Sequence, residues 1–525
     1  LSTIGTLVVD EVHMIDDPNR GPTLEILITR LRNFLKSCQI VALSATINNA
    51  KEIADWLGGV LVKSDYRPVE LKEGIYLNGS IKFKKGDKKV ASSNSKPELQ
   101  LVEDTVKKSK SALVFLSSRK NTEAVAKKAS PIVSRLISEK DKKELKKVSD
   151  KILNSLSKPT PQCRLAASCV EQGVAFHHAG LLSKQRQLIE EAFRNRLIKI
   201  ICCTPTLAMG LNVPAFRVIV RDLKRYAGGY MDWIPVLEYK QWVGRAGRPG
   251  LEDWGEGITI AKTESQKEVI ADKYVSGEPE EIYSKLSAEP ILRMQALGLI
   301  ASSEVNSLEK LAEFFSKTFF AFQYEDMARL EAKLEKVVDE LFEFGFIKKR
   351  VKMLVPTRLG KRVAELYIDP LSAHVMLERL EKSNKKLMYY LHTLCSCYEM
   401  YPLLRIRSKE FDEIQGMFFD FEDDLPETPD PWGGEYDRFI RAFKTSLLFL
   451  DWVNESGEDK LYTKYKETPG ALRNHLFIAD WLVYSMHELA KITGKKDELT
   501  PLRKLRIRLK HGVKENLLRL IRFKG

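Results

Sequence analysis

Cysteine is scarce in this chain of 525 residues, and its seven cysteines follow no recognisable pattern. There is no Cys-x-x-Cys pair; Cys202 and Cys203 are adjacent, and Cys395 and Cys397 are two residues apart. This spacing argues against a disulfide framework and against a zinc site. It favours a reducing compartment, and we expect a cytoplasmic protein.

Long apolar runs are also missing. No stretch approaches the roughly 20 consecutive apolar residues that a membrane-spanning helix needs, so we expect no membrane partner. The chain does not begin with methionine, and its apolar start is interpreted as a strand rather than as a signal peptide. We therefore interpret the sequence as a fragment.

Acidic residues are outnumbered by basic ones. The chain has 85 Lys and Arg against 71 Asp and Glu, a net charge of +14, with a pI near 9.2. This balance favours a polyanionic partner such as a nucleic acid. The length exceeds the roughly 250–300 residues at which a single hydrophobic core stops growing, which predicts several domains.

The apolar stretch from Thr6 to Val9 ends directly in Asp10-Glu11-Val12-His13. A buried parallel strand that delivers acids to its carboxyl end has this pattern, and nucleotides bind at that edge of open α/β sheets. We expect Asp10 to hold Mg²⁺ and Glu11 to orient and deprotonate the water that attacks a γ-phosphate. A solvated acidic turn explains the same residues if they stand alone.

Three further segments follow in order: Leu43-Ser44-Ala45-Thr46-Ile47, Thr204 to Pro214, and Gln241 to Gly250. With the acidic segment they resemble motifs II, III, V and VI of the superfamily 2 nucleic-acid helicases. The run from Asp10 to Glu25 is particularly similar to the archaeal replication-repair helicases of the Hjm type, relatives of the helicase domain of DNA polymerase theta. The resemblance covers nearly the whole chain.

This resemblance implies an ATP-dependent 3′→5′ DNA helicase that unwinds forked and branched DNA in replication-coupled repair. It implies ATP and Mg²⁺ as cofactors, single-stranded and forked DNA as substrate, replication or repair proteins as partners, and a monomeric state. However, no G-x-x-x-x-G-K-[ST] phosphate-binding loop occurs in the sequence. The resemblance places that loop upstream of Asp10, and we expect this fragment alone to be inactive.

The resemblance also assigns roles at the ATP site. Gln241 positions the attacking water, Arg245 and Gly210 contact the nucleotide, and Arg248 is the arginine finger. Arginine suits this task because its planar fork binds two phosphate oxygens at once. A coupling relay between ATP and domain closure is assigned to His13, Ser44 and Thr46, although a purely structural histidine is an open alternative for His13.

Contacts to nucleic acid are assigned to residues at strand ends, which bind phosphates without reading bases: Ser117, Arg119, Thr204 and Thr206. Between motifs V and VI, Gly228-Gly229 flanked by aromatic residues predicts a β-hairpin. In the resemblance this hairpin is the pin that wedges the duplex apart, with the candidate aromatics Tyr226, Tyr230 and Trp233. A plain surface hairpin is the alternative. His177 and His178 suit a structural role as well as a contacting one.

The segment from Ala471 to Ile492 is an amphipathic helix in pattern, with Arg473, Asn474 and Trp481 on one strip of its surface. It resembles the family's ratchet helix, in which an arginine and a tryptophan stack on single-strand bases. The register leaves either Arg473 or Asn474 at the arginine's place. A core tryptophan is the rival interpretation of Trp481.

The fold class we predict is α/β plus all-α. Strands are expected at 6–9, 39–42, 112–116, 174–176, 198–202 and 217–220, and the segment from Ser130 to Pro161 is expected to be a solvated helical insertion. The predicted domains are the end of a first RecA-like domain (1–70), a second RecA-like domain with the hairpin (71–277), a winged helix with its wing at 354–360 (278–369), a helical ratchet bundle (370–494), and a basic, truncated helix-hairpin-helix end (495–525).

Two other functions share parts of this pattern. An RNA helicase of the exosome-associated or spliceosomal kind carries the same motifs, although the exosome type needs a long insertion that does not fit between Ser287 and Pro370. A non-catalytic scaffold that binds branched DNA is compatible with the missing phosphate-binding loop. Such a scaffold has no use for Asp10, Glu11, Gln241 and Arg248 together.

Overall fold

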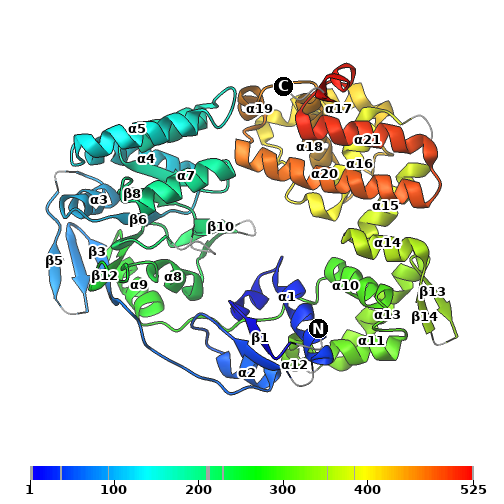
Figure 1. Cartoon of the computed structure of the whole chain (residues 1–525), viewed down its shortest axis with the longest axis horizontal. Coiled ribbons are helices and arrows are strands. Elements are labelled where there is room, and N and C mark those ends of the chain that lie inside the picture. Colours follow the sequence, from blue (N-terminus) through cyan, green and yellow to red (C-terminus); the bar gives the residue numbers. More distant parts are fainter. Residues whose placement is uncertain are drawn as a thin grey trace. The chain divides into compact units, whose positions relative to one another are not determined.

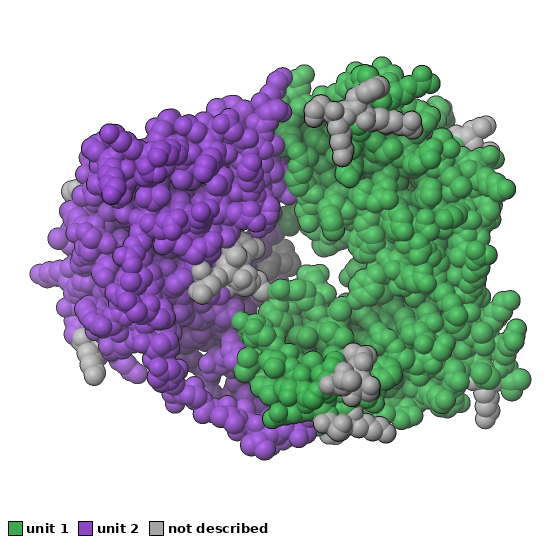
Figure 2. All heavy atoms as spheres, viewed as in Figure 1, with its two compact units in different colours: residues 1–43, 282–467, 472–525 green, residues 44–281, 468–471 purple. Residues whose placement is uncertain are grey.

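The computed structural model describes residues 4–35, 38–84, 86–92, 94–207, 213–227, 230–324, 326–351, 353–382 and 385–522, without the side chains of Thr206, Ala227 and Arg522. The chain forms two compact units (Figures 1 and 2). One comprises residues 44–281 with 468–471 and is called the sheet unit below. The other comprises residues 1–43, 282–467 and 472–525 and is called the helical unit.

An eight-stranded sheet forms the centre of the sheet unit, in the order β5-β4-β3-β12-β9-β6-β8-β7. The strands from β3 to β7 in this order are parallel, and β4 and β5 extend the sheet as antiparallel strands. The bounds are β3 (Glu70–Leu77), β4 (Ser80–Phe83), β5 (Asp87–Lys89), β6 (Ala112–Phe115), β7 (Val174–His177), β8 (Ile200–Cys203), β9 (Arg217–Val220) and β12 (Trp254–Ile260). The four strands predicted in this region are confirmed to within two residues.

Helices cover both faces of this sheet, which explains why its central strands are almost wholly apolar. Figure 1 shows α4, α5 and α7 on one side of the strands and α8 and α9 on the other. The helices are α2 (Ala50–Leu57), α3 (Pro97–Lys107), α4 (Arg119–Ser134), α5 (Glu139–Leu153), α6 (Pro161–Glu171), α7 (Ser183–Arg194), α8 (Val236–Val243) and α9 (Glu264–Ile270), with short helical turns at Pro205–Leu207 and Ala271–Val275.

The helix α5 corrects the expectation of a solvated insertion. Leu145 and Ile152 of α5 are fully buried, and the helix packs on α6 and α7. Its charged residues occupy the outer face, and its few apolar residues at helical spacing form a stripe that joins the core. The sequence analysis did not recognise this stripe, because charged residues make up most of the helix.

A buried arginine holds the amino edge of the sheet together. Arg217, at the start of β9, is fully buried; its Nε lies 2.8 Å from Glu256 Oε2 and its Nη2 lies 2.8 Å from Asp104 Oδ2. Arg217 also donates to the carbonyl of Leu101 and the hydroxyl of Thr105. Because its charge and donors are matched by carboxylates and other acceptors, burial of this guanidinium is tolerated.

The helical unit begins with a parallel strand pair, β1 (Thr6–Val9) and β2 (Gln39–Ala42), joined by a short helical turn (Val12–Asp16) and α1 (Gly21–Phe34). Both strands were predicted, and β1 is parallel as expected; its pairing with β2 is shown by the structure. The expected burial of β1 is wrong, since Val8 is 58 % exposed. Within the described residues this sheet has two strands, so much of the surface of β1 has no neighbour to cover it.

The remainder of the helical unit is mostly helix around one continuous apolar core. Its elements are α10 (Glu289–Ala301), α11 (Leu308–Phe315), α12 (Phe319–Tyr324), α13 (Met327–Glu343), the antiparallel strands β13 (Ile347–Arg350) and β14 (Met353–Pro356), α14 (Arg358–Leu366), α15 (Pro370–Glu381), α16 (Leu387–Ser396), α17 (Phe411–Phe421), α18 (Tyr436–Val453), α19 (Glu458–Tyr465), α20 (Pro469–Ile492) and α21 (Lys496–His511), with short 3-10 turns between and after them. The segment predicted to be a wing, 354–360, is instead divided between β14 and α14. No helix in the described part of the chain is long and apolar enough to cross a membrane.

A buried carboxyl group joins α1 to the rest of the helical unit. Glu25 Oε2 accepts a hydrogen bond from Ser284 Oγ at 2.5 Å, and Glu25 Oε1 accepts one from the backbone N–H of Phe320 at 2.7 Å. Burial raises the pKa of Glu25 to about 7, against the opposing effect of these hydrogen bonds. The segment that follows the acidic motif is therefore anchored through a carboxyl group whose charge changes near neutral pH.

Candidate functional site

The two acids of the first motif lie at the carboxyl end of β1, as predicted. The backbone N–H of Leu43 donates to the carbonyl of Val9, and that of Val12 donates to the carbonyl of Leu43, both at 2.8 Å, so the ends of the two parallel strands are adjacent. Asp10 and Glu11 are both exposed. Glu11 has a left-handed backbone (φ 53°), and its N–H donates to Asp10 Oδ1 at 2.9 Å.

These carboxylates suit a magnesium ion that is shared with phosphate. Mg²⁺ usually takes one or two carboxylates and completes its shell with water and phosphate oxygens. Within the described ranges, no group of three or more His, Cys, Asp or Glu residues could hold a metal ion. Two exposed, adjacent carboxylates at a strand end therefore fit a metal that arrives with its nucleotide better than one held by the protein alone.

His13 lies directly behind the acids. It is buried, and its Nε2 lies 3.3 Å from Glu11 Oε2. Burial lowers the pKa of His13, although Glu11 and Asp10 raise it, so the imidazole is held mainly neutral. A neutral imidazole at this distance can orient the Glu11 carboxylate. Ser44 follows Leu43 in the chain, and both Ser44 and Thr46 are exposed.

Motif VI forms the loop between α8 and β12. Gln241 lies in the last turn of α8, and Arg245 and Arg248 follow it. Two backbone hydrogen bonds attach this loop to the chain just before β9: Ala215 N–H to the carbonyl of Arg245 at 3.0 Å, and Gly247 N–H to the carbonyl of Ala215 at 2.7 Å. The loop therefore lies at the amino edge of the parallel sheet.

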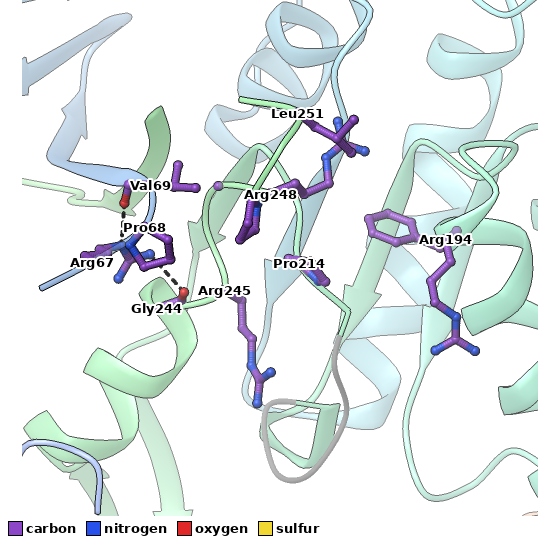
Figure 3. A pocket seen from close by; sticks show the side chains of 12 residues that line it. Arg67, Pro68, Val69, Arg194, Pro214, Gly244, Arg245, Arg248 and Leu251 are labelled. Atoms are coloured by element: carbon purple, nitrogen blue, oxygen red, sulfur yellow. Dashed lines mark hydrogen bonds between the residues drawn. The ribbon is translucent and has the colours of Figure 1, made fainter. Parts of the chain in front are cut away.

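Arg67 holds this loop in place and was missed by the sequence analysis. Its guanidinium donates to the carbonyls of Val69 (2.8 Å), Gly244 (2.9 Å) and Ala246 (2.8 Å), as Figure 3 shows in part. Gly247 has φ +90°, and a Cβ there would lie 2.5 Å from Val69 Cγ1, so only glycine fits. The sequence signal for Arg67 was a single Arg-Pro step, which does not reveal three distant carbonyl acceptors.

A cavity of about 650 Å³ opens at this loop (Figure 3). Among the described residues that line it, four are arginines and none is acidic. The arginines are Arg67, Arg194, Arg245 and Arg248. Arg67 is committed to backbone carbonyls, and Arg248 is bound by Glu252. In Figure 3 the Arg245 side chain extends away from that of Arg248. Such a lining suits an anion such as a polyphosphate.

The opposite edge of the same sheet carries two of the predicted nucleic-acid residues, Ser117 and Arg119. Ser117 follows β6, and its N–H and Oγ both bond to Asp222 Oδ2, at 3.0 and 3.1 Å, so this hydroxyl is already engaged. Arg119 is exposed in the first turn of α4. A helix start with an exposed arginine is a suitable phosphate contact.

Motif V is described only in part. Thr204 is buried at the end of β8, and its N–H donates to the carbonyl of His177 at 3.2 Å, which does not favour direct contact through its side chain. The side chain of Thr206 and all of Gly210 lie outside the described residues. His177 and His178 are buried against Glu190 (3.0 Å) and Glu123 (3.3 Å), which favours the structural interpretation of both.

The predicted hairpin is formed by β10 (Lys224–Ala227) and β11 (Tyr230–Trp233), which pair antiparallel; Gly228 and Gly229 lie outside the described residues. Tyr226 and Tyr230 are exposed near its end. Trp233 is different, because it pairs with Lys224 at the base, is half-buried, and packs beneath the ammonium of Lys224 at 4.4 Å. The geometry therefore favours the tyrosines over Trp233 as residues that meet a duplex.

The strip predicted on α20 is only partly exposed. Trp481 is half-buried, and its Nε1 donates to the carbonyl of Leu366 at 3.0 Å. Arg473 pairs with Glu458 and lies 5.2 Å from the ring of Trp452, while Asn474 is exposed. The exposed aromatic residue is Phe477, at 73 %, one turn from both Arg473 and Trp481. The i, i+4 spacing could have indicated it.

Three segments of the chain match models of known helicase families. Residues 1–53 match the family described as DEAD/DEAH box helicase, residues 153–250 match the helicase conserved C-terminal domain, and residues 388–512 match archaeal helicase, domain 4. The three matches include, in turn, the acidic motif, motif VI and α20.

Similarity over nearly all of this chain extends to named relatives. The ATP-dependent DNA helicase Hel308 of Methanococcus vannielii is 38% identical over 100% of this chain and 75% of the relative. The Hel308 proteins of Methanocella arvoryzae and Pyrococcus horikoshii are each 39% identical, over 100% and 99% of this chain and 71% of each relative. The chain therefore belongs to the Hel308 family of archaeal superfamily 2 ATP-dependent DNA helicases.

Proposed function

We propose that this protein is an ATP-dependent DNA helicase that hydrolyses ATP with Asp10, Glu11, Gln241, Arg245 and Arg248. The observation that supports this most strongly is the pair of exposed carboxylates at the end of parallel strands β1 and β2. The arginine-lined, acid-free cavity at motif VI supports it independently. The first feature suits a magnesium-bound nucleotide and the second suits its phosphates.

In this proposal Asp10 would hold a Mg²⁺ ion, which would supply positive charge to neutralise the phosphates during γ-phosphoryl transfer. Glu11 accepts the proton of the attacking water. His13, neutral and 3.3 Å from Glu11, keeps that carboxylate oriented. Arg245 and Arg248 stabilise the charge that spreads over the phosphate oxygens, and Gln241 positions the water. Ser44 and Thr46 transmit the nucleotide state.

We propose the same division into domains as the sequence predicts: RecA-like segments at 1–70 and 71–277, a winged helix at 278–369, a ratchet bundle at 370–494 and a basic end at 495–525. The helices α10, α11 and α13 followed by the β13–β14 hairpin are the elements that a winged helix contains. They support that assignment, with the wing at 347–356.

For DNA, we propose that Arg119 and Thr206 contact phosphates, while Ser117, bound to Asp222, and the buried Thr204 fix the strand ends beside them. We also propose strand separation by the hairpin tyrosines and base stacking along α20. Exposed aromatic rings bind single-stranded bases through their faces, whatever the base. Phe477 is the exposed ring on α20, and we propose that it stacks on bases beside Arg473 and Asn474, whereas the half-buried Trp481, predicted for this role, mainly stabilises the packing of the helix. The polarity is proposed to be 3′→5′ and the substrate a forked duplex.

The remaining proposals concern the setting of the protein. We propose that it acts as a monomer together with replication or repair proteins. The cysteines support a cytoplasmic location, since all seven are free thiols in the structure. The net charge of +14 supports a nucleic-acid substrate.

Unwinding of labelled forked duplexes by the full-length protein tests this function. We expect ATP- and Mg²⁺-dependent unwinding of a fork with a 3′ tail, and none of a duplex with only a 5′ tail. Glu11→Gln should remove ATP hydrolysis and leave binding of single-stranded DNA unchanged. Single-stranded RNA of the same sequence should compete poorly. Full unwinding by Glu11→Gln, or equal competition by RNA, contradicts the proposal.

A further inference from the structure

Arg248 is bound by an acid from its own loop. Its Nε lies 3.1 and 3.0 Å from Glu252 Oε1 and Oε2, its Nη2 contacts Oε1, and its backbone N–H donates to Oε2 at 3.0 Å. The side chains are 14 % and 3 % exposed. Burial would raise the pKa of Glu252, but the bonds from Arg248 outweigh it, so the pKa lies below its usual value.

This ion pair occupies one of the edges through which the Arg248 guanidinium can bind phosphate. Arginine binds two oxygens side by side through its planar fork, and Glu252 already takes the Nε and Nη2 positions. Arg248 must therefore exchange or share these donors to bind phosphate through the same edge. The buried Glu252 carboxylate needs another partner when Arg248 leaves it, because an unpaired buried charge destabilises the fold.

Glu252 also lies close to a second cation, Lys110. Lys110 Nζ lies 3.6 Å from Glu252 Oε1, just before the start of β6. Lys110, Arg196 and Lys199 line a small cavity of about 160 Å³ together with Arg248 and Glu252. Ser111 lines it as well; this residue is 6 % exposed, and its Oγ has no hydrogen-bond partner among the described residues.

We propose that Glu252 is the resting counter-ion of Arg248, and that Arg248 exchanges the Glu252 carboxylate for phosphate oxygens when ATP binds. Lys110 retains the carboxylate after the exchange, and the Ser111 hydroxyl is free to donate to it. Glu252 is thus a positioning residue that sets the affinity for ATP by competing for one arginine. This inference rests on the proposed function and adds a mechanism to it.

The test compares two substitutions with opposite expected effects on ATP hydrolysis by the full-length protein. Glu252→Gln keeps the shape and removes the competing charge, so the KM for ATP should fall about fivefold or more, with a smaller change in kcat. Lys110→Met removes the second cation, so Glu252 should retain Arg248 more strongly and the KM should rise. If the ion pair only stabilises the fold, the two substitutions should not shift the KM for ATP in opposite directions.

The matched control is Glu256→Gln, which removes the carboxylate charge from another buried pair, with Arg217, elsewhere in the sheet unit. We expect it to lower the melting temperature and leave the KM for ATP unchanged. Equal KM values for wild type and Glu252→Gln, or a rise in KM for both Glu252→Gln and Lys110→Met, overturn the inference. If Glu252→Gln does not fold, the partly exposed Lys110 still decides the question through the direction of its KM change. Absence of DNA-stimulated hydrolysis in wild type refutes the proposed function instead.

Discussion

Replacing Glu25 by glutamine should change how the stability of the helical unit depends on pH. Burial raises the pKa of Glu25 from 4.5 to about 7, so the folded protein keeps this carboxyl protonated over a range in which the unfolded chain has lost the proton. The protonated Glu25 therefore makes its full contribution to the free energy of unfolding below pH 4.5, and this contribution is lost as the pH rises to about 7.

The size of the effect follows from the same two values. At about 1.4 kcal/mol per pH unit, the interval from 4.5 to about 7 corresponds to about 3 kcal/mol of unfolding free energy. Glu25→Gln has no proton to lose, and its amide oxygen can still accept from the N–H of Phe320. The difference in stability, variant minus wild type, should grow by about 3 kcal/mol between pH 4 and pH 8.

Urea unfolding of both proteins at several pH values in this interval measures the difference, and other titrating groups cancel because each comparison is made at one pH. Glu331→Gln, at an exposed position on α13, is the matched control and should follow the wild-type profile. Parallel pH profiles for wild type and Glu25→Gln would refute the argument that burial dominates the hydrogen bonds from Ser284 and Phe320.

Two further predictions concern DNA. Replacing Tyr226 and Tyr230 by alanine should abolish strand separation and spare DNA-stimulated ATP hydrolysis, whereas Trp233→Ala should mainly lower the melting temperature; equal loss of unwinding and hydrolysis in the tyrosine variant would remove the wedge role. Phe477→Ala should weaken binding of single-stranded DNA roughly tenfold with little change in melting temperature, since one base–aromatic stack contributes about 1–3 kcal/mol. Trp481→Ala should lower the melting temperature more, and the reverse ranking would restore Trp481 as the stacking ring.

The strands and the long helix were predictable because their signals are local. The runs at Thr6–Val9 and Arg217–Val220 are short, apolar and bounded by polar residues, which is the pattern of a strand in a parallel sheet. Tyr226 and Tyr230 on either side of Gly228-Gly229 likewise predicted a hairpin. Elements shaped by sparse apolar residues in charged sequence, such as α5, were harder to interpret.

The candidate site was predictable only where neighbours in sequence are neighbours in space. Asp10, Glu11 and His13 form one short turn, so their proximity follows from the sequence. Trp481 bonds to the carbonyl of Leu366, a residue far away in the chain, and this predicted stacking residue is half-buried in the packed structure. The exposure of Phe477 is likewise a property of the packed structure.

By itself, the sequence determined the family, the order of its motifs and the residue types available for chemistry, because these are properties of short segments and their succession. The tertiary structure alone decided that Arg67 fastens motif VI, that Glu252 pairs with Arg248 with Lys110 beside it, and that motif VI and Ser117 lie on opposite edges of one sheet. Which carboxylate meets which guanidinium depends on strand order and burial, and neither is encoded by the spacing of residues along the chain.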